Sequence, residues 1–364
     1  LKDVTADHPI LDEDKYYAIL LMDGDRMGRL VNGETLASRW RTVLHPDLVS
    51  RLERTDFAAK YRRFWKERLE SRRLLAPQTH AAISEALGDF SLYTVPAVIG
   101  ECHGRLIYAG GDDVCAVMPL STVMDAARRI ALCYSMGFVF IQEKAGRVPE
   151  EVSRHWTPAP GRLAVHLGQG DDISISAGIL ICHHKKPLSA AMRRAHEVLN
   201  LAKNMGGRNA LALELQKRSG GARRFIVGWD ETPIKELFPA ASMDGMNGNR
   251  LLDHFFAAAK ALSTTQGRRL SSSLVYRLEE FRPGLEAIVG ERPGDLVKFL
   301  IKHVSRSGVN SASEVNENVA RSMAALLTRR IHGDGLTVDT DGLLIARFLG
   351  ASLSRSAENA GGSK

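Results

Sequence analysis

Short apolar runs separated by longer amphipathic stretches mark the first part of the chain. Residues 16–22 read YYAILLM, a run of aromatic and branched side chains that is typical of a buried central strand. Residues 105–109 (RLIYA) and 114–118 (VCAVM) flank a Gly-Gly pair, which is the pattern of a β-hairpin. Residues 173–181 (ISISAGILI) predict a further strand, and residues 209–215 predict a last one.

Helical periodicity fills the segments between these strands. Short and long helices are expected over residues 26–32, 121–141 and 188–203, the last ended by Gly206-Gly207. The resulting order of strand, helix, hairpin, helix, strand, helix, strand predicts an α+β fold with a ferredoxin-like core. A charge-rich helical insertion at about residues 33–93 lies between the first helix and the hairpin, with breaks at His45-Pro46 and Ala76-Pro77.

The composition changes after the last predicted strand. Residues 228–250 are rich in Gly, Pro, Met and Asn and indicate a linker. Beyond them the pattern is helical, and the tail from Ser354 is expected to fray. We therefore predict two domains, a ferredoxin-like domain at 1–227 and an all-α helical bundle at 228–364. The expected helices of the second domain begin at 251 and cover 274–281, 295–304 and 315–330.

Composition narrows the class of protein. The 364 residues have the apolar and charged fractions of a soluble globular protein, without a long uncharged apolar run or a secretory signal, so we expect a cytoplasmic location and no membrane. The first residue is Leu1, so we expect a piece of a longer protein. The net charge of +7 is compatible with a polyanionic partner. Residues 51–73 hold nine Lys/Arg against four Asp/Glu, either a solvated helix or a face for RNA or a partner subunit.

Two acidic pairs stand at the ends of predicted strands. Asp23 and Asp25 follow the first strand, and Asp112 and Asp113 occupy the hairpin tip. Because the first strand and the hairpin are neighbours in a ferredoxin-like core, the pairs should meet. Clustered carboxylates repel each other, and divalent cations relieve that repulsion; Mg²⁺ prefers carboxylate, water and phosphate oxygens. Two such ions could activate a sugar hydroxyl and stabilise a leaving pyrophosphate.

Glycines and cations near these acids suit a triphosphate. Gly110 and Gly111 can take positive φ and leave room for phosphates to approach the backbone, and Gly24 could offer its carbonyl to a metal. Lys203 supplies a point charge and Arg208 a planar fork, both suited to phosphate oxygens. The alternatives are two ordinary polar turns and a lysine that merely favours a helix dipole.

The motifs resemble those of known nucleotide cyclases. LLMDGDRMG, YAGGDDV and LAKNMGGRNAL are similar to the metal-binding strand end, the hairpin signature and the phosphate-contacting segment of the GGDEF and palm/cyclase superfamily. A closer resemblance is to the large subunit of type III-B CRISPR (Cmr) complexes, specifically its second palm and C-terminal helical domain. The segments HAAISEALGDFSLYTVPAVIGECHGRLIYAGGDDVCAVMPL, ISISAGILICHHKKPL and GRNALALELQKRSG carry it. It covers about residues 14–227 well and the helical remainder more loosely, and it implies that the domain at 1–227 is a palm/cyclase domain.

This resemblance implies an activity and assigns roles. Such proteins condense ATP into cyclic oligoadenylates when their complex binds target RNA: the 3′-hydroxyl of one ATP attacks the α-phosphorus of another, and pyrophosphate leaves. By position, Asp23, Asp112 and Asp113 would be catalytic and would hold Mg²⁺ or Mn²⁺. The residues expected to contact the nucleotide and its metal are Gly24, Asp25, Gly110, Gly111, Lys203 and Arg208.

The resemblance also implies partners. These are the other effector subunits (a small helical subunit, backbone subunits and the subunit at the crRNA end) and, through the complex, crRNA and target RNA. The HD nuclease, first palm and zinc-binding region of the family have no counterpart in these 364 residues. Since cyclic synthesis in the family uses two facing palms, we expect the chain alone to bind ATP and Mg²⁺ but make little product unless it self-pairs.

Two other functions stay open at this point. One is a diguanylate-cyclase-like enzyme, which a preference for GTP over ATP would reveal. The other is a non-enzymatic scaffold that holds RNA and protein subunits, although the intact GGDD sequence argues against a pure scaffold.

Overall fold

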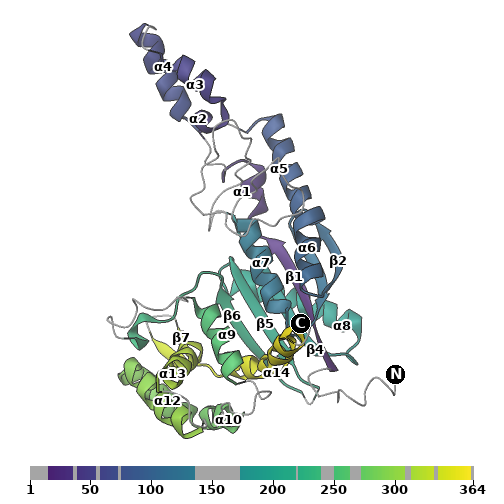
Figure 1. Ribbon diagram of the computed structural model, residues 1–364, viewed down its shortest axis with the longest axis vertical. Helices are drawn as coiled ribbons and strands as arrows, with labels where there is room; N and C mark the ends of the chain where they lie inside the picture. Colours follow the sequence, from purple (N-terminus) through teal and green to yellow (C-terminus); the bar gives the residue numbers. More distant parts are fainter. Residues whose placement is uncertain are drawn as a thin grey trace. The chain divides into compact units, whose positions relative to one another are not determined.

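The computed structural model describes residues 15–35, 39–54, 58–72, 75–135, 173–218, 220–238, 250–262, 272–307, 313–331 and 335–361 (Figure 1). The chain divides into two compact units. The hairpin unit comprises Leu20–Val117 and Asp125–Ala177, and the helical unit comprises Leu1–Ile19, Met118–Met124 and Gly178–Lys364.

A six-stranded sheet runs in the order β2-β3-β1-β4-β5-β6. Its first four strands have the neighbours of a ferredoxin-like core, which confirms the predicted palm fold and puts β1 beside the hairpin. The strands are β1 (Tyr16–Gly24), β2 (Arg105–Gly110), β3 (Asp113–Met118), β4 (Ile175–His183), β5 (Ala210–Gln216) and β6 (Ala222–Gly228).

The central strands owe their place to their apolar runs. Every residue of β4 is buried, and β1 is buried from Ala18 to Met22. A strand covered on both faces must be apolar at successive positions, whereas an edge strand alternates. In the edge strand β6, the buried residues Phe225 and Val227 alternate with the partly buried residues Ile226 and Gly228.

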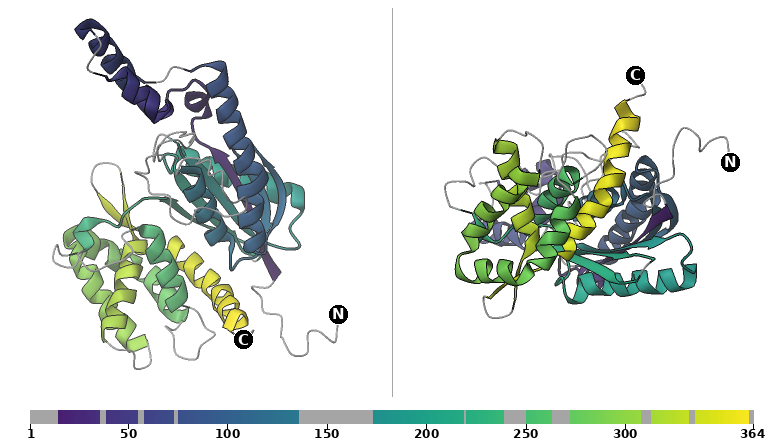
Figure 2. Two further views of the ribbon diagram at one scale, coloured as in Figure 1. Left: turned by 45° about the horizontal axis from the view of Figure 1, so that its top comes forward. Right: turned by 90° about the horizontal axis from the view of Figure 1, so that it is seen from below.

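Most helices of the hairpin unit precede β2 in the chain, and η2 and α6 pack on β2. Pro46 and Pro77 lie in the first turns of α3 and α5, so each predicted break is the start of a helix. The fixed φ of proline suits that position. The segments α5, η2 and α6 form one continuous helical rod in Figures 1 and 2, and η2 is a π-helical turn within it. The helices of this unit are α1 (Met27–Val31), α2 (Trp40–Val43), α3 (Pro46–Leu52), α4 (Ala59–Glu70), α5 (Pro77–Asp89), η2 (Phe90–Thr94), α6 (Val95–Glu101) and α7 (Val123–Ser135), the last beginning at the edge of the helical unit.

The helical unit combines strands β5 and β6 with a bundle (green to yellow in Figures 1 and 2). Helix α8 packs on β5, α14 packs on β6, and α9 packs against both α13 and α14. The helices are α8 (Leu188–Asn204), η4 (Lys235–Leu237), α9 (Leu251–Ala261), α10 (Ser272–Glu280), α11 (Arg282–Glu291), α12 (Pro293–Ser307), α13 (Ser313–Leu327) and α14 (Asp341–Gly361). None of the helices among the described residues is long and apolar enough to cross a bilayer.

The second predicted domain is largely but not entirely helical. The helix expected over 315–330 ends at Leu327, and a short hairpin follows, made of β7 (Thr328–Arg330) and β8 (Leu336–Val338). Thr328 turns its hydroxyl back to the carbonyl of Ala324, a bond that competes with helix continuation.

Other expectations need correction. Strand β6 was not expected, so β5 is not the last strand of the sheet. The tail expected to fray belongs to α14, which reaches Gly361. The linker expected over 228–250 contains the short helix η4, and residues 239–249 lie outside the described part, as do residues 136–141 of the helix expected over 121–141. The domain boundary at residue 227 stays a prediction.

Candidate active site

The β2–β3 turn presents two carboxylates. Gly110 pairs with Asp113, which leaves Gly111 and Asp112 as a two-residue turn. Gly111 has a φ of 62°, the conformation that a tight hairpin requires at its first central position and that glycine adopts without strain. Gly110 lacks a positive φ; its missing side chain instead leaves room for the phenol of Tyr108.

The end of β1 lies against this turn. A Cβ built on Gly24 would be 2.7 Å from Oδ2 of Asp112, so a glycine here permits the carboxylate to approach the β1 backbone. The same Cβ would be 2.6 Å from Oη of Tyr134 on α7. Gly24 and Asp112, about 90 positions apart in sequence, therefore meet, as the predicted neighbouring of the first strand and the hairpin requires.

Asp25 is held rigidly within the protein. It is buried, and its carboxylate accepts hydrogen bonds from the hydroxyl of Ser174 at 2.8 Å and from that of Ser176 at 2.8 and 2.9 Å. Its backbone amide also donates to the Ser174 carbonyl at 2.8 Å. Both serines are buried, so these bonds replace the water that a carboxylate would otherwise need. Asp25 thus fixes the end of β1 to the start of β4, and its predicted contact with nucleotide or metal stays a prediction.

Tyr134 is the residue at this site that sequence reasoning missed. Its phenol is buried, donates to the sulfur of Met27 at 3.2 Å, and packs edge-on against Phe90 at 5.1 Å. Burial raises the pKa of this phenol well above its ordinary value, and the charges of four carboxylates (those of Asp112, Asp25, Asp23 and Asp113, in falling order) raise it further. All four predicted acids therefore act electrostatically on one protonated hydroxyl. In the sequence, Tyr134 is one apolar position among others in a predicted helix, and no motif distinguishes it as part of the site.

The acids differ in exposure in a way that suits hard cations. Asp23 and Asp112 are half-buried and Asp113 is exposed. Among the described residues no three His, Cys, Asp or Glu side chains are grouped closely enough to form a preformed metal cage. Mg²⁺ bound with a nucleotide needs fewer, because it takes one or two carboxylates together with waters and phosphate oxygens. The oxygen donors here fit that requirement.

The two predicted phosphate contacts belong to the helical unit. Lys203 is in the last turn of α8. Arg208 follows it with a φ of 71° and donates its backbone amide to the carbonyl of Ala202 at 3.3 Å. This hydrogen bond closes the turn that follows α8. The predicted role of Lys203 and Arg208 in binding phosphates stays a prediction.

Comparison with known proteins decides the family. The family model for the second palm domain of Cas10/Cmr2 matches residues 16–212, more than half of the chain. The chain belongs to the Cas10/Cmr2 family. The predicted resemblance is thereby confirmed, and the GGDD turn and the β1 end both lie within the matched Cas10/Cmr2 palm.

A curated Cas10/Cmr2 relative and two solved structures agree with this placement. The CRISPR system Cmr subunit Cmr2 of Pyrococcus furiosus is 36% identical over 217 residues, which is 59% of this chain and 20% of the relative. The chain thus spans about a fifth of that relative's length. In fold, the whole chain matches 40% of a chain of the type III-B Cmr-beta complex in its apo state, with a TM-score of 0.57 and 15% identity. The same complex bound to cognate target RNA gives a TM-score of 0.53, 16% identity and the same shares of each chain.

Proposed function

We propose that this chain is the ATP-binding palm of a type III CRISPR effector large subunit, and that it contributes to cyclic oligoadenylate synthesis when the complex binds target RNA. The observation that carries the proposal is the meeting of Asp112 with Gly24, which brings the GGDD turn to the end of β1 that carries Asp23. Membership of the Cas10/Cmr2 family supports the effector role and a cytoplasmic location.

Each residue of the site has a task in this proposal. Asp23, Asp112 and Asp113 hold Mg²⁺ or Mn²⁺, which supplies charge neutralisation at the α-phosphate and a more acidic 3′-hydroxyl. Gly111 turns the chain so that the backbone can approach the triphosphate. Tyr134 stays protonated and donates its one O–H to the sulfur of Met27, so it adds no negative charge to the acids of the site.

Phosphates need positive charge as well as a cation. Lys203 and Arg208 meet that need in the proposal, the first as a point charge and the second as a planar fork. The reaction joins the 3′-oxygen of one ATP to the α-phosphorus of another and breaks the bond to pyrophosphate. The complete large subunit supplies the first palm, which a cyclic product requires in addition to this one, so the chain alone binds ATP but forms little product.

Nucleotide titration tests this function. By calorimetry with Mg²⁺, the chain should bind ATP more tightly than GTP, and Asp112→Ala/Asp113→Ala should weaken ATP binding by roughly tenfold or more. The matched control is Asp47→Ala/Glu85→Ala, which removes two exposed acids from α3 and α5 and changes the net charge equally. Equal ATP affinity in the two double variants would refute the site, and a preference for GTP would favour a diguanylate-cyclase-like enzyme.

A further inference from the structure

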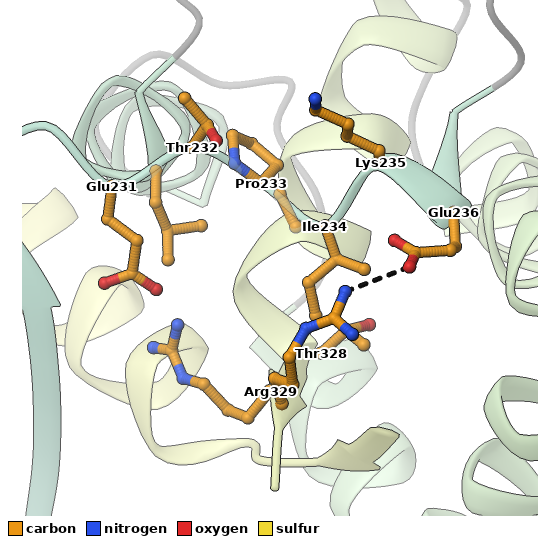
Figure 3. Close-up of a pocket in the computed structure, with 11 residues that line it drawn as sticks. Glu231, Thr232, Pro233, Ile234, Lys235, Glu236, Thr328 and Arg329 are labelled. Atoms are coloured by element: carbon orange, nitrogen blue, oxygen red, sulfur yellow. Dashed lines mark hydrogen bonds and ion pairs between the residues drawn. The ribbon is translucent and has the colours of Figure 1, made fainter. Parts of the chain in front are cut away.

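A pocket of about 390 Å³ opens within the helical unit, far along the chain from the GGDD turn (Figure 3). One wall is the segment that precedes and includes η4, residues 231–236, and the other is the end of α13 with β7. Apolar walls come from Pro233, Ile234, Leu251 and Ala325. The volume is that of a small-molecule site, and the lining combines apolar walls with a few charged groups, as such sites usually do.

The unusual group in this pocket is the guanidinium of Arg329 on β7. Its terminal nitrogens Nη1 and Nη2 are buried, and neither finds a hydrogen-bond partner among the described residues. The guanidinium lies over the ring of Phe225, 4.6 Å from the centroid, which covers one face and leaves the in-plane donors unused. An arginine stays charged in proteins, and a buried charge without hydrogen bonds is costly. An oxyanion would supply both missing acceptors.

The neighbouring groups already have partners. Arg330 pairs with Glu236 at 2.9 Å. Glu231 accepts from the backbone amide of Gly228 at 2.8 Å through Oε2. Figure 3 shows the Glu231 carboxylate and the Arg329 guanidinium directed toward one another, but they form no ion pair within the 4.0 Å that such a pair requires. Burial lowers the pKa of Arg329, while the charges of Glu231 and Asp339 act against that decrease.

We propose that this pocket binds a singly charged carboxylate, with Arg329 holding both carboxylate oxygens. The planar guanidinium fork matches a planar carboxylate, and the apolar walls suit the organic part that carries it. Three cationic side chains line the pocket (Lys235, Arg329 and Arg330) against two acids. That balance suits one negative charge. Glu231 would repel a dianion or a run of phosphates, so a nucleic acid backbone is disfavoured.

Ligand-observed NMR on the whole 364-residue chain tests the proposal with three probes: propionate, a capped Gly-Glu-Gly tripeptide and inorganic phosphate. Propionate or the tripeptide should bind, and phosphate should bind more weakly. Arg329→Gln should weaken carboxylate binding by roughly tenfold or more, because it removes a charge-assisted bidentate pair. The matched control is Arg330→Gln on the same strand, whose partner is Glu236, and it should bind as the wild type does.

The probes separate the two sources of a carboxylate. Tighter binding of the tripeptide would identify an acidic side chain of a partner protein, and tighter binding of propionate would identify a small metabolite. Glu231→Gln should bind inorganic phosphate more tightly than the wild type does, because the repelling charge is gone. A purely structural Arg329 would not produce this result. The experiment also stays informative if Arg329→Gln fails to fold. The proposal is overturned if neither carboxylate binds, if phosphate is preferred by the wild type, or if Arg329→Gln binds carboxylate as tightly as Arg330→Gln.

Discussion

The space at Gly24 gives the sharpest test of how the two acidic pairs come together. Replacing Gly24 by alanine adds one Cβ, which would lie 2.6 Å from Oη of Tyr134, 2.7 Å from Oδ2 of Asp112 and 2.8 Å from Cβ of Asp112. Contacts this short force something to move. The two oxygens are at the ends of side chains and can shift, but the Asp112 Cβ can move only with the backbone of the β2–β3 turn.

The size of the effect follows from that geometry. Adding a methyl group to a filled site costs about 1–3 kcal/mol. In a domain of this size each kcal/mol lowers the melting temperature by about 2–4 °C. Because Asp112 is displaced, affinity for ATP with Mg²⁺ should decrease by roughly 10–100-fold, as when an outer contact of a metal site is lost.

Gly28 on α1 supplies the matched control, because a Cβ there meets nothing within 4 Å. Gly28→Ala should leave ATP affinity unchanged and stabilise the chain by about 0.5–1 kcal/mol, since alanine favours a helix. Adding Tyr134→Phe to Gly24→Ala removes the contact with Oη but not the contacts with Asp112. The double variant should therefore be more stable than Gly24→Ala, while its ATP binding stays as weak. If Gly24→Ala binds ATP with Mg²⁺ as tightly as Gly28→Ala does, the claim that ATP binding requires Asp112 to lie against Gly24 is wrong.

Two further predictions concern stability. Ser176→Ala removes one of the hydroxyl donors to the buried carboxylate of Asp25, so urea unfolding should show a loss of about 1–3 kcal/mol, whereas the exposed Ser84→Ala on α5 should change little. Burial, followed by the interaction with Cys182, raises the pKa of Tyr17 to about 12. An unfolded tyrosine ionises near pH 10, so the folded chain should lose stability as the pH rises from about 10 to about 12. In thermal melts, Tyr17→Phe should reduce that loss. An unchanged pH profile of the melting temperature in Tyr17→Phe would contradict this prediction.

The palm core was predictable because its local and tertiary signals agree. Residues 16–22 are apolar at successive positions, as a strand with two covered faces must be, and Gly111 takes the positive φ that its turn needs. The sheet order then follows from the ferredoxin-like arrangement, which places Asp112 near Gly24.

The missed features depend on contacts that no local pattern encodes. Strand β6 begins with Ala-Arg-Arg and is recognisable only through its pairing with β5. Residues 328–330 continue a helical pattern, yet pairing with β8 makes them a strand. Tyr134 lies 107 residues from Met27, and Ser176 lies 151 residues from Asp25, so neither contact has a sequence signature.

The central claim is that the end of β1 and the β2–β3 turn hold divalent cations beneath a triphosphate and share one of them. The most direct measurement is a double-mutant cycle on Asp23→Ala and Asp112→Ala, with Mn²⁺ binding in the presence of ATP measured by electron paramagnetic resonance. Each single variant should weaken Mn²⁺ binding, and the double variant should lose less than the sum, because both residues serve the same ion. Strictly additive losses, or no loss in either single variant, would contradict the shared site.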